Sequence, residues 1–242
     1  MRNFGLLGKH IDYSFSRGYF KDKFETNKLD CSYNNFDLEK IKDFEALKST
    51  AQLSGLNVTI PYKQDVIPYL DAIDLEAQEI GAVNTIKFEN GKLTGYNTDH
   101  YGFEHSLKPH LKPLHKKALI LGTGGASKAV AFALRKLGIS FEYVSRTQSS
   151  AVKYTYESLS KKGIKDYEII INCTPLGTFP DITKCPQIPY EQITSNHLLF
   201  DLIYNPEETL FLKQGKKNNA TTLNGLEMLR LQAEKSWEIW NS

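Results

Sequence analysis

A short apolar run that breaks into glycines constrains this chain more than any other stretch. Residues 118–130 read ALILGTGGASKAV, which predicts a strand, a tight turn and the start of a helix. Gly122 and Gly124 lack a Cβ atom, so the backbone can take positive φ and a phosphate can approach its amides. The pattern is typical of a dinucleotide pyrophosphate site. Because Ser127 stands at the third glycine position, an ordinary strand-to-helix turn is the alternative.

The residues after this turn favour the dinucleotide interpretation. A helix that closes at Gly138 and a second strand over 141–144 complete a βαβ unit. That strand runs into Ser145, Arg146 and Thr147, without the acidic residue that accepts the ribose hydroxyls of NAD. An arginine attracts a 2′-phosphate where a carboxylate repels it. The sequence therefore predicts NADP rather than NAD, unless Arg146 is only a surface cation.

Composition narrows the class of protein. A chain of 242 residues can form two modest domains or one large one, and its apolar content of 40% is that of a globular protein. A net charge of +2 gives no reason to expect a nucleic-acid partner. No apolar stretch is long enough for a signal peptide or a membrane span, so we expect a cytoplasmic protein without a membrane partner. The cysteines and histidines lack metal-ligand spacing, so we expect no metal site.

The N-terminal half contains a second alternation of strands and helices. We expect strands over 3–7, 32–36 and 55–60 and a helix over 38–47. Ser14 and Ser16 precede a helical sequence. On an extended loop both hydroxyls would face one ligand and suit a carboxylate, whereas alone they read as a helix N-cap and its neighbour.

Two further polar clusters follow predicted strands. Thr59 and Lys63 stand at the carboxyl end of the strand over 55–60, where open α/β sheets bind ligands, although a lysine there is usually a solvated turn residue. An Asn-Gly turn at 90–91 predicts a hairpin that leads into Asn97, Thr98 and Asp99. Asp99 is either a helix cap or the partner of Lys63 in an acid/base pair.

The C-terminal half continues the parallel pattern. Residues 108–117 are rich in Pro and Lys and suggest a domain boundary. Strands are expected over 168–171 and 198–203, the first leading into a loop at 172–177 that should meet the cofactor. We expect a helix to open at Tyr204–Thr209 and a last helix over 226–240.

Read together, these segments resemble the shikimate dehydrogenase family from end to end. The match rests on nine short motifs in the right order: SFS at 14–16, NVTIPYK at 57–63, GAVNT at 81–85, NTD at 97–99, GTGGA at 122–126, SRT at 145–147, NCT at 172–174, DLIY at 201–204 and GLEMLRLQ at 225–232.

The resemblance implies an α/β protein of two domains with the active-site cleft between them. It implies a substrate-binding domain at 1–103, an NADP-binding Rossmann domain at 104–224 and a C-terminal helix at 225–242 that returns to the first domain. The implied reaction is the reversible reduction of 3-dehydroshikimate to shikimate by NADPH in aromatic amino acid biosynthesis. The protein would act as a monomer or a homodimer.

The same resemblance implies a role for individual residues. Lys63 and Asp99 would be the catalytic pair. Ser14 and Ser16 would hold the substrate carboxylate, and the other substrate contacts would be Thr59, Asn84, Tyr204 and Gln232. The cofactor would meet Gly122, Gly124, Gly125 and Ala126 at the pyrophosphate, Ser145, Arg146 and Thr147 at the 2′-phosphate, and Thr174, Leu202 and Gly225 further along.

Two other functions fit the same motifs. One is a sister dehydrogenase that acts on quinate and uses NAD. The other is a non-catalytic NADP-binding regulatory protein, against which the intact Lys63 and Asp99 argue, because a protein without chemistry has no need of that pair.

Overall fold

The computed structural model describes residues 1–12 and 14–242. These residues form two compact units, one of Met1–Thr98 with Ala233–Ser242 and the other of Asp99–Gln232. Each unit is built around its own six-stranded sheet. The α/β class expected from the alternating pattern is confirmed.

The first unit has a mixed sheet. Its strands are β1 (Arg2–Gly8), β2 (Cys31–Asp37), β3 (Leu53–Val58), β4 (Ala72–Ile73), β5 (Thr85–Glu89) and β6 (Lys92–Tyr96), in the order β2-β1-β3-β5-β6-β4. The strands β2, β1 and β3 are parallel, whereas β5 is antiparallel to both β3 and β6. Asn90 and Gly91 both have positive φ, so the predicted tight turn between β5 and β6 is confirmed.

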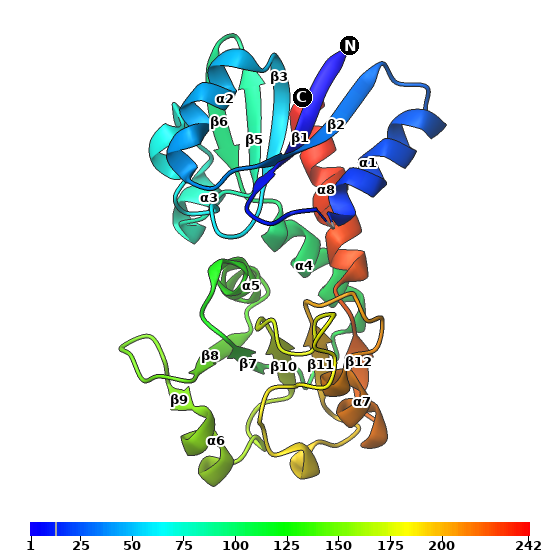
Figure 1. Cartoon of the computed structure of the whole chain (residues 1–242). Helices are drawn as coiled ribbons and strands as arrows, with labels where there is room; N and C mark the ends of the chain where they lie inside the picture. Colours follow the sequence, from blue (N-terminus) through cyan, green and yellow to red (C-terminus); the bar gives the residue numbers. More distant parts are fainter. Residues whose placement is uncertain (13) are drawn as a thin grey trace. The chain divides into compact units, whose positions relative to one another are not determined.

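Aromatic side chains hold the C-terminal end of the chain on this sheet. The helices of the first unit are α1 (Phe15–Thr26), α2 (Phe44–Thr50), α3 (Leu75–Ile80) and the last turns of α8 (Leu226–Asn241), which lies beside β1 and α1 (Figure 1). The Trp240 ring packs on Phe4 and Phe20, with centroids 4.8 and 5.4 Å apart, and its indole N–H donates to the Ile86 carbonyl at 3.0 Å. Arg2 also donates to the Trp240 carbonyl at 2.7 Å. The two termini therefore lie close together.

The second unit has an all-parallel sheet. Its strands are β7 (Lys117–Leu121), β8 (Ser140–Ser145), β9 (Tyr154–Thr155), β10 (Ile169–Asn172), β11 (Leu198–Asp201) and β12 (Thr221–Leu223). Their order is β12-β11-β10-β7-β8-β9, which is the 3-2-1-4-5-6 order of dinucleotide-binding folds when counting starts at β7. The order reverses between β7 and β10, where such folds bind their ligands.

Alternate strand residues of the second unit bury opposite faces of its sheet. Ala118 and Ile120 pack with α5 (Gly125–Lys136), α4 (Asp99–Leu107) and the start of α8. Leu119 and Leu121 pack with α6 (Tyr156–Lys162) and α7 (Leu210–Lys217) on the other face. Because both faces are covered, β7, β10 and β11 are buried along their length, apart from the exposed Lys117 at the start of β7, as their continuous apolar runs predict.

Two predicted helices begin later than expected. In place of a helix over 38–47 the chain has a 3-10 helix at Ile41–Asp43 and then α2, with Lys40 as an extended N-cap and the Leu38 N–H donating to the Gly8 carbonyl at 2.9 Å. The helix expected to open at 204–209 begins at Leu210 instead. Its N-cap is Thr209, which accepts the Leu212 N–H at 3.3 Å and is fixed by a bond to Asp201.

Candidate functional site

The glycine turn lies at the switch point of the second sheet. Gly122 has φ of +101°, and its N–H donates to the Val144 carbonyl at 2.8 Å. A Cβ atom there would lie 3.1 Å from the Thr174 methyl group, so the turn needs glycine both for its φ and for its packing. The turn after β7 and the loop after β10 are therefore in contact at Gly122 and Thr174.

The start of α5 has the form of an anion cradle. Its N-cap is Gly124, which carries no side chain to occupy the first amides of the helix. A Cβ atom at Gly124 or Gly125 would meet nothing within 4 Å, so open space lies beside this backbone. Ser127 is buried and closes the turn from inside, its hydroxyl donating to the Gly124 carbonyl at 2.6 Å. These residues fit the pyrophosphate of a dinucleotide.

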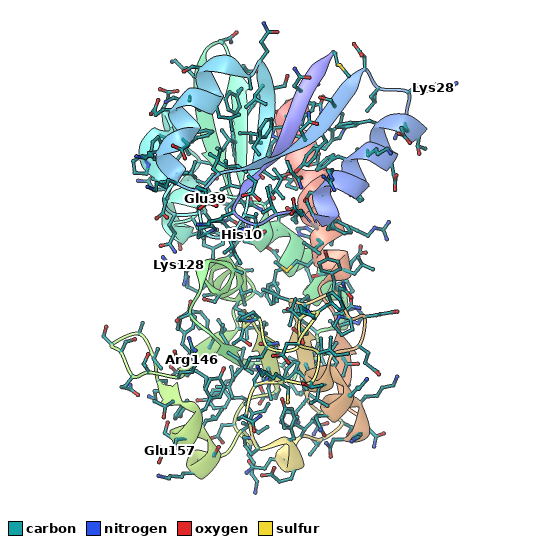
Figure 2. All side chains as sticks on the ribbon, viewed as in Figure 1. His10, Lys28, Glu39, Lys128, Arg146 and Glu157 are labelled. Atoms are coloured by element: carbon teal, nitrogen blue, oxygen red, sulfur yellow. The ribbon has the colours of Figure 1, made fainter. Side chains whose placement is uncertain are left out.

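The end of β8 carries the residues expected to choose the cofactor. Figure 2 shows Arg146 directly after this strand, where Arg146 and Thr147 are exposed and Ser145 is half-buried. Burial raises the pKa of the Tyr156 hydroxyl to about 12, and the Arg146 guanidinium works against this shift. The cation therefore lies within electrostatic reach of the start of α6. Its charge suits a phosphate on the ribose.

A buried carboxylate organises the loops after β10 and β11. Asp201 accepts hydrogen bonds from the Asn172 amide at 3.0 Å, the Ile203 N–H at 3.1 Å and the Thr209 hydroxyl at 2.6 Å. The Asn172 side-chain oxygen in turn accepts the N–H and the hydroxyl of Thr174. Burial raises the pKa of Asp201 to about 6 despite these donors. The network fixes both loops, and polar residues ending two buried strands were the only sign of it in the sequence.

Gly225, which follows β12, lies against Leu202, which follows β11. The Gly225 N–H donates to the Ile203 carbonyl at 3.0 Å, and a side chain at Gly225 would overlap the Leu202 carbonyl. Tyr204 follows on the same segment and is half-buried, and burial raises its pKa. The residues expected near the cofactor thus come from the carboxyl ends of β7, β8, β10 and β11 and from the residues after β12.

In the first unit the structure confirms the helix N-cap interpretation of the two serines. Ser14 is the N-cap of α1 and accepts the Arg17 N–H at 3.3 Å, whereas Ser16 lies inside the first turn of that helix. The two residues are therefore not on one extended loop. Helical backbone wins here because Ser14 satisfies one of the first helix amides.

Lys63 lies in the turn that follows β3. The Thr59 N–H donates to the Leu7 carbonyl at 2.9 Å, which ties the start of this turn to β1. The Lys63 carbonyl accepts the Val83 N–H at 2.7 Å, so the turn is bound to the segment that carries Asn84. Both Thr59 and Lys63 are half-buried.

Asn84 is tied to the residues that lead into Asp99. The Asn84 side-chain oxygen accepts the Thr98 N–H at 2.7 Å, and its amide donates to the Thr98 hydroxyl at 3.0 Å. The Asn97 amide donates to the Ala82 carbonyl at 2.9 Å. Lys63, Asn84 and Thr98 are thereby fixed within one network of the first unit, with Asp99 next in sequence.

Asp99 and Gln232 are the terminal residues of the second unit. Asp99 is the first residue of α4, and Gln232 lies on α8 with its amide donating to the Leu229 carbonyl at 2.8 Å. Both side chains are buried, although a helical glutamine is usually exposed. Lys63 belongs to the other unit, so its pairing with Asp99 stays a prediction.

No three His, Cys, Asp or Glu side chains of residues 1–12 and 14–242 lie together as metal ligands. No helix within the same ranges is both long and apolar enough to cross a membrane. A cavity of about 260 Å³ beside Ser106, His110 and Glu227 is lined by none of the predicted site residues.

Comparison with known proteins decides the family. Residues 6–86 match the family model described as the shikimate dehydrogenase substrate binding domain. A Clostridium beijerinckii protein named shikimate dehydrogenase (NADP(+)) is 41% identical, over 99% of this chain and 92% of that protein. The chain belongs to the shikimate dehydrogenase family.

Other members of the shikimate dehydrogenase family match over similar lengths. A Methanococcus maripaludis protein of the same name is 40% identical, over 98% of this chain and 90% of its own. The crystal structure of the Thermus thermophilus shikimate 5-dehydrogenase, in complex with NADP(H) and shikimate, is 31% identical. It superimposes with a TM-score of 0.86 over 99% of this chain and 93% of that one. The predicted family is confirmed.

Proposed function

We propose that this protein catalyses the reversible reduction of 3-dehydroshikimate to shikimate with NADPH. The observation that carries the proposal is the open glycine turn at the switch point, with Arg146 and no acidic residue at the end of the next strand, in a chain of this family. Relatives named shikimate dehydrogenase (NADP(+)) match it over nearly its whole length. NADP is accordingly the proposed cofactor.

Backbone amides and one cation would hold the cofactor. The amides of Gly124, Gly125 and Ala126 at the start of α5 would bind the pyrophosphate, and Gly122 lets the chain turn beneath it. Ser145, Arg146 and Thr147 would bind the 2′-phosphate. Asp201 fixes the two segments that carry Thr174 and Leu202. These two residues, together with Gly225, would face the nicotinamide end of the cofactor. When bound, NADPH supplies the hydride that reduces the substrate carbonyl.

Polar side chains would bind the substrate. Ser14 and Ser16 offer hydroxyls to its carboxylate, while Thr59, Asn84, Tyr204 and Gln232 would contact its hydroxyl groups. We propose that residues 1–103 form the substrate-binding domain, residues 104–224 the NADP-binding domain and residues 225–242 a helix that returns to the former.

Lys63 and Asp99 would carry the proton chemistry. As the carbonyl carbon is reduced, its oxygen gains negative charge, which the Lys63 ammonium can stabilise before donating a proton to it. The Asp99 carboxylate would orient the ammonium and accept a substrate hydroxyl proton as a hydrogen bond. Since interacting groups titrate together, the proton belongs to the pair rather than to either residue.

We infer a cytoplasmic protein that is a monomer or a homodimer. Its three cysteines are all free thiols, which fits a reducing compartment.

The test is the appearance of reduced nicotinamide when the protein is mixed with shikimate or quinate, each with NADP or NAD. We expect turnover largely confined to shikimate with NADP. Equal turnover of quinate, or equal use of NAD, would make the protein the sister dehydrogenase. NADP binding without turnover of any pair would make it a regulatory protein.

A further inference from the structure

A connected group of polar side chains is buried inside the first unit. Its members come from β2, β3, the start of β5 with the residue before it, the residue before α4, and α8. None is more than 8% exposed: Tyr33, Asn57, Asn84, Thr85, Thr98 and Ser236. Burying so many polar groups is unfavourable unless their hydrogen bonds are made. The direction of each bond shows how the group is organised.

Asn57 sets the direction at the centre of the group. Its side-chain amide donates to the Ser236 hydroxyl at 2.9 Å and faces the Asn84 carbonyl at 3.4 Å. A carbonyl only accepts, so the nitrogen of Asn57 must point this way and its oxygen the other. That oxygen accepts the Tyr33 hydroxyl proton at 2.8 Å.

Tyr33 holds Asn57 from one side. Its ring stacks on Phe20, with centroids 4.7 Å apart, and its hydroxyl proton is committed to the Asn57 oxygen. The position of the Tyr33 hydroxyl therefore helps to set the orientation of the Asn57 amide.

Ser236 connects the other side of Asn57 to Asn84. The Ser236 hydroxyl lies 2.8 Å from the Thr85 hydroxyl and 3.2 Å from the Thr98 hydroxyl. Thr98 holds the Asn84 carboxamide by two bonds, one of them from its backbone N–H. Because a backbone N–H can only donate, the Asn84 atom that faces it must be the carboxamide oxygen.

We propose that Tyr33 and Ser236 are positioning residues of the substrate site, which hold the Asn57 amide between them and so fix Asn84 in one hydrogen-bonded frame. The proposal rests on the proposed function, in which Asn84 contacts a substrate hydroxyl. One buried chain of hydrogen bonds then aligns the Asn84 side chain with the substrate.

The kinetic test compares Tyr33→Phe, Ser236→Ala and the double variant with the wild-type enzyme. Each single change should raise KM for shikimate about tenfold, which is the loss of roughly one hydrogen bond, and leave KM for NADP unchanged. The double variant should be close to the worse single variant, since both act through Asn57. Ser32→Ala is the matched control, because Ser32 neighbours Tyr33 but its hydroxyl donates to Asn3 at 3.0 Å, outside the chain.

A second measurement needs no turnover. Hydrogen exchange of the Thr98 amide, followed by NMR in the unliganded protein, should speed up in Tyr33→Phe and Ser236→Ala but not in Ser32→Ala. The Leu56 amide on β3 serves as the internal reference.

The outcomes separate this proposal from the proposed function. Absence of shikimate turnover by the wild-type protein contradicts the function, and the exchange of the Thr98 amide still decides the frame. Unchanged KM for shikimate in both single variants, strict additivity in the double variant, or unchanged Thr98 exchange would each overturn the proposal.

Discussion

The Asn172 amide donates to the Asp201 carboxylate at 3.0 Å, joining the carboxyl ends of β10 and β11. Both side chains are fully buried, and the Thr209 hydroxyl completes the set of donors on the other carboxylate oxygen. Burial nevertheless raises the pKa of Asp201 from 3.8 to about 6. Keeping the Asp201 carboxylate charged therefore lowers the stability of the folded protein.

This raised pKa predicts a pH dependence of stability. The folded protein binds the Asp201 proton more tightly than the unfolded chain, so stability from this group falls as pH rises from about 4 to about 6. Asp201→Asn removes this pH-dependent contribution to stability, because the amide does not titrate. The free energy of unfolding should be measured against pH for the wild type and for this variant. The difference between the two proteins, wild type minus variant, should be larger at pH 4 than at pH 7 by up to about 3 kcal/mol. Parallel curves would show that Asp201 titrates alike in both states.

Any side chain at Gly225 should clash with the backbone. A methyl group there would overlap the Leu202 carbonyl, so Gly225→Ala should lower the free energy of unfolding by about 1–3 kcal/mol. Gly18→Ala is the control, because Gly18 lies on α1 with nothing within 4 Å of an added methyl group, and alanine favours helix by about 1 kcal/mol. Denaturant titration should move the two midpoints in opposite directions. A neutral Gly225→Ala would mean that the Leu202 segment can shift freely.

Arg146 predicts the cofactor preference. Arg146→Ala should raise KM for NADP by about tenfold to a hundredfold, since hydrogen bonds to charged groups contribute about 1.5–3 kcal/mol, and should leave KM for NAD nearly unchanged. Lys161→Ala removes another exposed cation, one that pairs with Glu157 at 2.7 Å on α6, and should change neither constant. An equal loss with both cofactors would place Arg146 outside the 2′-phosphate site.

Local chemistry explains what the sequence predicted correctly. The turn after β7, the end of α5 before Gly138 and the Asn90-Gly91 hairpin each depend on residues close together in the chain. Glycine is needed at Gly122 and Gly138 because both have positive φ. The parallel order of the second sheet follows from repeated strand and helix patterns of the same kind.

Contacts between distant segments account for what the sequence did not predict. Residues 38–40 continue from β2, with the Leu38 N–H bound to Gly8 of β1, and α7 starts late because its N-cap Thr209 is bound to Asp201. The frame around Asn57 joins residues up to 179 positions apart, and its only sequence sign is a polar residue within an apolar strand. The short elements β4, β9, β12, α3 and α6 also carry too few residues to show a period.

Proton donation by Lys63 to the substrate carbonyl oxygen is the step on which the proposed function depends most directly. The measurement that tests it most directly is the rate of NADP reduction by shikimate with the wild-type protein and with Lys63→Ala, together with the dissociation constant of NADP for each. We expect the wild type to turn over, and Lys63→Ala to lose at least about a hundredfold in kcat while binding NADP equally well. Undiminished turnover by Lys63→Ala would contradict the assigned chemistry, and no turnover by the wild type would contradict the function itself.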